Sequence, residues 1–343
     1  MIRAAPAPMY YPEFSSEFRS FTDGLRETPV AVLGHLRPDG DCIGSQVALC
    51  RVWRKLGIDA VCVNGDPVPR RLAFLVGDTP FFQPDQAPLA GRSAVQVDCA
   101  DRTRPGKSLG KTFSDILGNI DHHISNTGYA RHNFVDGSSA AAAEVLAGIF
   151  LDNGWPIDPL TAQGLYAGIA TDTGQFRFPS TSKRVFSITG QLLDAGADPS
   201  AAAHELYEQE SFGRMRLLQA FLASLRLENN GRVCAGILPA SVFKETGTTS
   251  EDTEGLVDYA RSIEGVEIAL LIEEKDGAVK GSFRAKDAVF RVDVPAGQLN
   301  GGGHACAAGF NLRQSLDKAY PQILDIINRH LAEIDRGRQS AAS

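Results

Sequence analysis

The chain has 343 residues, of which 43% are hydrophobic and 22% charged, and its formal net charge is −7. This length and apolar content are enough for two domains with their own cores. No apolar run approaches the roughly 20 residues that cross a membrane, and the acidic balance argues against an electrostatic grip on long duplex DNA, so we expect neither a membrane nor duplex DNA as a partner.

The cysteines and the chain ends suggest where the protein works and which parts of it fold. The six cysteines include no C-x-x-C pair, a pattern typical of reduced thiols in a cytoplasmic protein. The N-terminal segment has three prolines among its first 12 residues and lacks the basic-then-apolar pattern of a signal peptide. We expect residues 1–19 to be a flexible lead-in and residues 333–343 to be a loose tail.

Short apolar runs alternate with helical spacing through the first part of the chain. Strands are predicted at 30–34, 59–63, 94–97 and 116–120, and helices at 43–56, 72–76, 138–152, 161–170 and 182–194. Strands that alternate with helices in this way indicate an α/β fold with a mostly parallel sheet and flanking helices on both faces. We assign this domain to residues 20–200.

The pattern changes in the remaining part of the chain. A helical pattern covers 201–229 and is predicted to be a connector, and Asn229-Asn230-Gly231 is a turn signal. After it, strands are predicted at 232–238, 266–273 and 279–283, and helices at 253–261 and 318–331. These elements predict a smaller α/β domain over 230–332.

Four groups of side chains that can bind metals each close an apolar segment. Asp121-His122-His123 follows the strand at 116–120, and burying all three side chains unpaired would cost several kcal/mol. The ends of strands in α/β sheets are where ligand sites are normally built. The other groups contribute five further residues, which are His35, Asp39, Asp41, Asp98 and Asp172.

Six of these residues form the predicted ligand set: His35, Asp39, Asp41, Asp98, His122 and Asp172. Six ligands are too many for one tetrahedral zinc site, and imidazole with carboxylate but no thiolate suits Mn²⁺ or Mg²⁺ better. Two cations bridged by one shared carboxylate would account for all six ligands. Such sites generate a hydroxide and hold phosphoryl oxygens during in-line displacement, so the predicted chemistry is phosphoester hydrolysis.

Three of these groups also have an ordinary structural explanation, whereas two adjacent histidines after Asp121 argue against such an explanation. Asp41 could cap the helix predicted from residue 43, and Asp98 and Asp172 could be turn or cap residues. An acid at a helix C-terminus, such as Asp172, opposes the helix dipole, which favours a nearby cation. Of the two adjacent histidines we expect at most one to bind metal and the other to face substrate, with Asp121 orienting an imidazole.

Gly301-Gly302-Gly303-His304 predicts an anion-binding turn in the second domain. We attribute the three glycines to close backbone approach and positive φ rather than to packing, and we expect a helix-like segment after them. Arg284 is a candidate phosphate clamp through its fork of donors. The alternatives are a flexible loop and a solvated arginine, but five basic against two acidic residues within 275–291 favour an anionic ligand.

The four ligand groups, in this order and at these separations, resemble the four motifs of the DHH phosphoesterase superfamily. The GGGH element resembles the signature of the DHHA1 accessory domain. The resemblance covers roughly residues 20–332. Length and domain content are most similar to the bacterial nanoRNase and 3′-phosphoadenosine 5′-phosphate (pAp) phosphatase branch.

The resemblance implies a role for each residue. His35, Asp39 and Asp98 would hold one Mn²⁺, and the other would be held by Asp41, Asp98, His122 and Asp172, with Asp98 bridging. His123, with Asp121, would act at the scissile phosphate. The implied contacts to the rest of the nucleotide come from Arg177, Arg284, Gly301, Gly302, Gly303 and His304.

The activity that this resemblance implies is hydrolysis of short oligonucleotides or linear dinucleotides to mononucleotides, and of pAp to AMP. Two other functions stay open. A cyclic dinucleotide phosphodiesterase would use the same site. A non-catalytic nucleotide sensor would be favoured by degenerate motifs, whereas every motif position here holds a competent residue. None of these three functions decides between a monomer and a homodimer.

Overall fold

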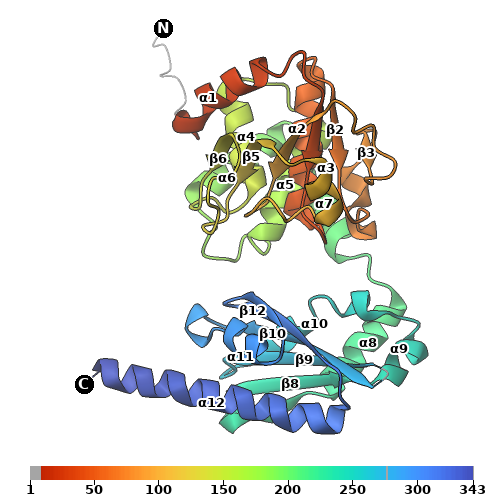
Figure 1. Cartoon of the computed structure of the whole chain (residues 1–343), viewed down its shortest axis with the longest axis vertical. Helices are drawn as coiled ribbons and strands as arrows, with labels where there is room; N and C mark the ends of the chain where they lie inside the picture. Colours follow the sequence, from red (N-terminus) through yellow and green to blue (C-terminus); the bar gives the residue numbers. More distant parts are fainter. Residues whose placement is uncertain (1–8, 276, 343) are drawn as a thin grey trace. The chain divides into compact units, whose positions relative to one another are not determined.

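The computed structural model describes residues 9–275 and 277–342 (Figure 1). The chain divides into two compact units, Met1–Gln209 and Glu210–Ser343. Each unit contains one six-stranded sheet in its described residues. None of the helices in these residues combines the length and apolar content that crossing a bilayer requires.

The sheet of the first unit is entirely parallel and has the order β3-β2-β1-β4-β5-β6. Its strands are β1 (Val30–Leu33), β2 (Ala60–Val63), β3 (Phe81–Phe82), β4 (Ser93–Val97), β5 (Ile116–Asp121) and β6 (His132–Val135). The strand order reverses between β1 and β4. The carboxyl ends of these two strands therefore flank the position at which parallel sheets usually bind their ligands.

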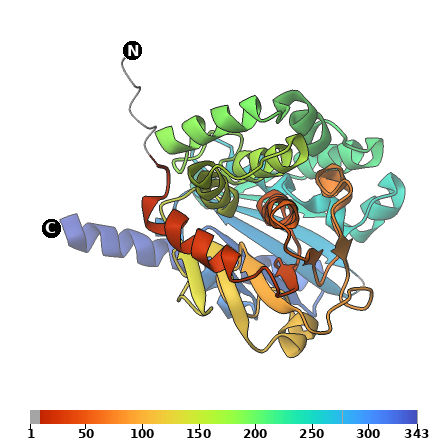
Figure 2. The same cartoon turned by 90° about the horizontal axis from the view of Figure 1, so that it is seen from above.

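Helices cover one face of this sheet more heavily than the other (Figure 2). They are α1 (Pro12–Asp23), α2 (Gly40–Lys55), η1 (Arg70–Leu75), α3 (Lys107–Thr112), α4 (Ala142–Asn153), α5 (Pro159–Asp172), α6 (Lys183–Asp194) and α7 (Pro199–Tyr207). Val30 and Val32 belong to the large core that includes α2, α4 and α5. Leu33 belongs to a smaller cluster that includes Leu109 of α3. The prediction of a parallel α/β sheet with flanking helices is confirmed.

Helices α2 and α5 touch through their backbones. A Cβ atom on Gly44 of α2 would lie 2.1 Å from the carbonyl oxygen of Gly164 on α5, so no other residue fits at Gly44 without moving a helix. Asp158 caps the N-terminus of α5 and pairs with Arg51 and Lys55 of α2. This contact fixes the two helices that carry three of the candidate metal ligands.

The lead-in expected over residues 1–19 is wrong from Pro12 onward, and residues 1–8 lie outside the described part. Pro12 begins α1, a helix position that proline favours. Phe18 is fully buried, and its ring packs 6.2 Å from that of Trp53 and 4.7 Å from that of Phe134. The aromatic residues of α1 recur at helical spacing, and burying them outweighs the effect of the nearby prolines.

The sheet of the second unit is mixed and has the order β11-β12-β10-β9-β8-β7. Its strands are β7 (Arg226–Glu228), β8 (Val233–Leu238), β9 (Ile268–Lys275), β10 (Ala278–Ala285), β11 (Gly302–His304) and β12 (Ala307–Leu312). Only β8 and β9 pair in parallel; the other pairs are antiparallel. The segment after the glycines, expected to be helix-like, is therefore strand β12.

Helices cover both faces of the second sheet. They are α8 (Phe212–Ala223), η2 (Asn229–Gly231), α9 (Ala240–Thr246), η3 (Ser250–Thr253), α10 (Leu256–Arg261), η4 (Ala288–Phe290), α11 (Asp293–Gln298) and α12 (Leu316–Ala342). One core contains residues of α11 and α12, and the other contains residues of α8 and α10. Between α7 and α8, residues 208–211 are not helical, and Ser211 caps α8.

The tail expected to be loose over residues 333–343 is helical from 333 to 342, and residue 343 lies outside the described part. Helix α12 continues to Ala342. Arg232 at the start of β8 binds both carboxylate oxygens of Asp335 at 2.7 and 2.9 Å. Leu331 is fully buried, and Ile334 packs against the same core. The apolar spacing of the predicted helix thus extends beyond residue 332 and keeps the helix on the sheet.

Candidate metal centre

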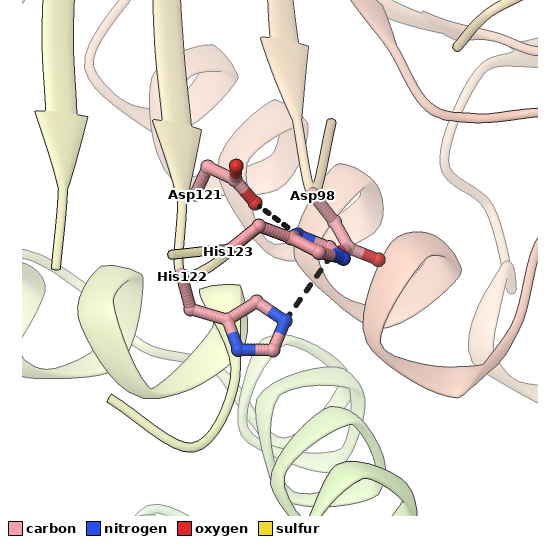
Figure 3. A group of neighbouring side chains, drawn as sticks. All are labelled: Asp98, Asp121, His122 and His123. Atoms are coloured by element: carbon pink, nitrogen blue, oxygen red, sulfur yellow. Dashed lines mark hydrogen bonds and ion pairs between the residues drawn. The ribbon is translucent and has the colours of Figure 1, made fainter. Parts of the chain in front are cut away.

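The candidate ligands meet at the carboxyl edge of the first sheet. Figure 3 shows Asp98, just after β4, facing His122 and His123, which follow β5. His35 is separated from the end of β1 by Gly34 alone, and Asp39 and Asp41 lie at the start of α2. Asp172 is the last residue of α5. Four segments that are distant in the sequence therefore converge on one site.

His35 and Asp39 lie on one side of Asp98. Nε2 of His35 is 3.1 Å from Oδ2 of Asp98 and 3.7 Å from Oδ1 of Asp39. Nδ1 of the same ring is 2.8 Å from the carbonyl oxygen of Leu36. Because a carbonyl can only accept, Nδ1 carries a proton, and Nε2 is the ring atom that faces the carboxylates.

His122 and Asp172 lie on the other side of Asp98. Nε2 of His122 is 3.3 Å from Oδ2 of Asp172, 3.5 Å from Oδ1 of Asp98 and 3.9 Å from Oδ2 of Asp41. Asp98 is 2% exposed and has a left-handed backbone with φ of 53°. Its two carboxylate oxygens thus face different groups of neighbours.

Asp41 is not the N-cap of helix α2, which was one explanation considered for it. The N-cap of α2 is Asp39, which accepts a hydrogen bond from the Cys42 N–H at 3.1 Å. Asp41 is fully buried and accepts from Ser45 Oγ at 3.0 Å. It also accepts from two backbone N–H groups at the start of α4, those of Ala142 at 2.7 Å and Ala143 at 2.8 Å. Asp41 therefore ties α2 to α4.

His123 is held by Asp121. Nδ1 of His123 is 2.7 Å from Oδ1 of Asp121, whose second oxygen accepts from Asn126 Nδ2 at 2.6 Å. Asp121 is fully buried, and 27% of the His123 side chain is exposed. The same Asn126 nitrogen also donates to Asn119 at 2.7 Å. Sequence reasoning missed both asparagines, because Asn119 lies inside strand β5 and Asn126 just after a turn, and neither position has a distinctive spacing.

The carboxylates crowd one another in a buried space. Burial and the charge of Asp98 raise the pKa of Asp41 to about 7. Burial and the charge of Asp41 likewise raise the pKa of Asp172. Burial would also raise the pKa of Asp98, but His122 and His35 lower it. For His122, burial is outweighed by its contacts with Asp98 and Asp41, so its pKa rises to about 10.

The donor set fits divalent cations. In each of three residue groups, the possible ligand atoms lie within 4.8 Å of one another, and Asp98 belongs to two of the groups. These groups are Asp98 with Asp121, His122 and His123; His35 with Cys42 and Asp98; and Asp41 with His122 and Asp172. Oδ1 of Asp98 is buried without a hydrogen-bond partner, an acceptor that a cation would satisfy. The thiol of Cys42 was not foreseen as a neighbour of the ligands.

The predicted substrate contacts come from both units. Arg177 is exposed, and its Nε donates to the carbonyl of Gly174 at 2.7 Å. Arg284 and His304 belong to the second unit. The pairings His304–Ala307 and Ala307–Arg284 place them in one row across β11, β12 and β10, so their side chains share a face of the sheet.

The reason given for the three glycines is confirmed in part, since Gly303 has the expected positive φ, and needs correction where it excluded packing. Gly303 has φ of 150°, and a Cβ atom on it would lie 2.4 Å from the carbonyl oxygen of Ala307. A Cβ atom on Gly301 would lie 2.1 Å from the carbonyl oxygen of Gly309. These two glycines are therefore required by close packing against β12, which we had excluded. Only Gly302 has open space around its Cα atom.

Two comparisons with known sequences agree with this geometry. The sequence model described as "DHH family, N-terminal domain" matches residues 29–169, and the model for the DHHA1 domain matches residues 230–333. A Thermus thermophilus protein named bifunctional oligoribonuclease and PAP phosphatase NrnA is 30% identical over 95% of this chain and 97% of its own length. A Bacillus subtilis protein with the same name is 27% identical over 85% of this chain and 91% of its own.

A solved structure shows the same fold. An exopolyphosphatase-related protein from Bacteroides fragilis superimposes with a TM-score of 0.86, covering 94% of this chain and 97% of its own. The two sequences are 20% identical, so this likeness concerns the fold alone.

Proposed function

The chain belongs to the DHH family and carries a DHHA1 domain, and from this premise we propose that it is a metal-dependent phosphoesterase. Its substrates are short oligonucleotides and linear dinucleotides, which it hydrolyses to mononucleotides, and pAp, which it hydrolyses to AMP. The names of the relatives from T. thermophilus and B. subtilis support this choice of substrates.

The position of Asp98 carries the proposal. One of its oxygens lies 3.1 Å from His35, and the other lies 3.5 Å from His122. A carboxylate between two separate sets of ligands is the arrangement that a pair of cations requires. His35, Asp39 and Asp98 would hold one ion, and Asp41, Asp98, His122 and Asp172 the other. We take Mn²⁺ as the ion, with Mg²⁺ as the second choice.

The bound pair would supply Lewis-acid chemistry: it lowers the pKa of a water molecule and neutralises charge on the phosphoryl oxygens. Around it, the side chains of the protein have distinct tasks. The buried carboxylates of Asp41 and Asp98 keep the ligand positions fixed through their hydrogen bonds and ring contacts. Their arrangement excludes bulk water from the inner side of the site, since both are almost completely buried.

His123 is suited to proton transfer at the leaving oxygen. Asp121 accepts from Nδ1 of His123 and thereby fixes the tautomer and the direction of the ring. The ring is the more exposed of the two histidines, with 27% of its side chain accessible against 16% for His122. A partly exposed imidazole held by a buried carboxylate is a common general acid in hydrolysis.

In the second unit, Arg284 and His304 would bind the part of the nucleotide that is not cleaved. Their shared sheet face also carries Lys280 and Ser282, which alternate with buried residues along β10. Lys280 is already paired with the buried carboxylate of Glu273 at 2.8 Å, so Arg284 is the stronger candidate for phosphate. Gly302, with open space above it, leaves room for an anion next to His304.

The test compares four substrates in the presence of Mn²⁺: pAp, a 5′-phosphorylated diribonucleotide, a long single-stranded RNA and cyclic di-AMP. We expect mononucleotides from the diribonucleotide and AMP from pAp, with slow cleavage of the long RNA. Asp98→Asn serves as the control that should reduce turnover to background. Preferential cleavage of cyclic di-AMP would replace the proposal by a cyclic dinucleotide phosphodiesterase. Binding of Mn²⁺ and nucleotides without turnover would replace it by a sensor.

A further inference from the structure

The N-terminus of α4 and the side chain of Asp41 hold each other in place. The N-cap residue Ala141 offers no side-chain cap to the helix. The N–H groups of Ala142 and Ala143 instead bind the two oxygens of Asp41, at 2.7 and 2.8 Å. A displacement of this helix end would therefore move the Asp41 carboxylate relative to His122, whose Nε2 lies 3.9 Å away.

Arg184 of α6 fastens the turn that leads into α4. Its Nε donates at 2.7 Å to Glu144, a fully buried carboxylate that also accepts from the Ala140 N–H at 2.6 Å. Its NH2 group donates to Asp136 at 2.9 Å and to Ser139 at 3.0 Å. One guanidinium thus joins Asp136, just after β6, to Glu144 in the first turn of α4.

Tyr11 completes this arrangement from the N-terminal segment. Its hydroxyl lies 2.7 Å from Ser139 Oγ, and Ser139 donates to Asp136 at 2.7 Å. Because Ser139 has one hydroxyl proton and the carboxylate can only accept, Tyr11 is the donor to Ser139. The guanidinium of Arg184 lies 4.5 Å from the centre of the Tyr11 ring, in cation–π geometry.

The same N-terminal segment also reaches the far end of α4. The N–H groups of Tyr10 and Tyr11 each donate at 2.8 Å to an oxygen of Asp152, in the last turn of the helix. Ser15 donates to Asp152 as well, at 2.8 Å. Both ends of α4 are therefore tied to residues 10–15. The DHH match covers 29–169, so Tyr11 and Arg184 both lie outside it.

We propose that Tyr11 and Arg184 form a clamp that positions Asp41 for metal binding through the turn at 136–144 and the N-terminus of α4. The proposal rests on the metal centre argued above. Neither residue of the clamp contacts a candidate ligand directly, so both are positioning residues. The ion affected is the one assigned to Asp41, Asp98, His122 and Asp172, because Asp41 accepts hydrogen bonds from the N-terminus of α4. Among the described residues, no such hydrogen bond joins α4 to His35, Asp39 or Asp98.

The experiment measures Mn²⁺ binding to the full chain after metal removal, by calorimetric titration and by electron paramagnetic resonance of free and bound Mn²⁺. Wild type should bind two ions. Arg184→Met should bind one ion as wild type does and the other at least tenfold more weakly. Arg184→Lys, which keeps the charge without the fork, should recover part of the affinity. Tyr11→Phe removes one hydroxyl and should weaken the same ion by a factor of about two to ten.

Arg92→Met is the matched control. Arg92 is 9% exposed and binds Asp59 at the opposite edge of the same sheet, so its loss destabilises the unit without reaching Asp41. It should lower Tm and leave both ions bound as in wild type. The proposal is overturned if Arg184→Lys and Tyr11→Phe bind both ions like wild type, or if Arg184→Met does so while losing thermal stability. Failure of the wild type to bind two ions would instead contradict the proposed metal centre.

Discussion

Nε2 of His35 and Oδ2 of Asp98 lie 3.1 Å apart, although the two residues are 63 positions apart in the chain. The contact spans the place where the strand order of the first sheet reverses, because His35 follows β1 and Asp98 follows β4. The helices that follow these strands, α2 and α3, pack in different cores of the sheet, so side chains that directly follow the two strand ends can meet. His35 and Asp98, from the loops after two neighbouring parallel strands, thus belong to the same group of candidate ligands.

His123 should affect the chemical step and not the binding of metal. His123→Asn is expected to lower kcat about 10²- to 10⁴-fold, because a positioned general acid is lost. Mn²⁺ stoichiometry should be unchanged. Steady-state kinetics on pAp and a Mn²⁺ titration measure the two quantities. Asp121→Asn is the companion variant and should lower kcat in the same direction. Loss of an ion from His123→Asn would identify this residue as a ligand.

Metal removal should destabilise the first unit. Burial and the charges of neighbouring carboxylates raise the pKa values of Asp41 and Asp172, and a cation relieves the repulsion between the carboxylates. Mn²⁺ at about a hundred times its Kd should add ~2.7 kcal/mol per site to the free energy of unfolding. Thermal unfolding with and without EDTA measures the effect. Asp98→Asn should lose most of it, and an equal response in this variant would place the ions elsewhere.

The metal-free protein should lose stability through Asp41 as the pH rises from about 4 to 7. The pKa of Asp41 is about 7 in the folded state, so the folded chain keeps a proton that the unfolded chain releases above about pH 4. This contribution is fully present below pH 4 and is lost as the pH passes 7. In EDTA, Asp41→Asn should therefore gain stability relative to wild type across this range. A difference in Tm that does not change with pH would contradict the raised pKa.

Gly44 should control the distance between the ligands on α2 and α5. Gly44→Ala places a methyl group 2.1 Å from the carbonyl of Gly164, so the helices must separate. We expect a loss of about 1–3 kcal/mol in the free energy of unfolding and weaker Mn²⁺ binding. Gly190→Ala in α6 is the control, because its Cβ meets no atom within 4 Å, and it should stabilise by about 0.5–1 kcal/mol. Unchanged stability in Gly44→Ala would refute the close contact.

The two central glycines of the GGGH element should behave differently. Gly303→Ala should destabilise the β11–β12 pair, because its Cβ would collide with Ala307 and Ala308. Gly302→Ala should leave Tm unchanged, since its surroundings are open. If Gly302 borders the phosphate, this variant should raise KM for pAp and leave kcat unchanged. Equal KM values for Gly302→Ala and wild type would leave Gly302 without a role in binding.

The fold of the first unit was predictable where strands are buried on both faces. Such strands appear as continuous apolar runs in β1 and β2, and as mostly apolar runs in β4 and β5, which contain Gln96 and Asn119. Strand β3 has two residues and β6 begins with His132 and Asn133, so neither gives an apolar run. Helix α3 has six residues and buries only Leu109, too little to show a period.

The candidate ligands were predictable because their side chains carry the chemistry themselves. Each histidine or aspartate stands at the end of a strand or helix, where an unpaired polar residue attracts notice. The groups that support them were not predictable in this way. The donors to Asp41 include the backbone N–H groups of Ala142 and Ala143, and backbone groups are the same in every sequence. Tyr11 contacts Ser139, 128 positions away, and Asn126 contacts Asp121 across a turn, and neither contact has a signal in the sequence.

The burial of α1 has a practical consequence for anyone who trims the gene. A protein begun at residue 29, where the DHH match starts, would retain every histidine and aspartate assigned to metal. It would also expose Trp53 and Phe134, which pack against Phe18, to solvent. Such a fragment would contain the full set of reactive groups and yet be prone to aggregation. The smallest useful version of this protein therefore starts before Tyr10.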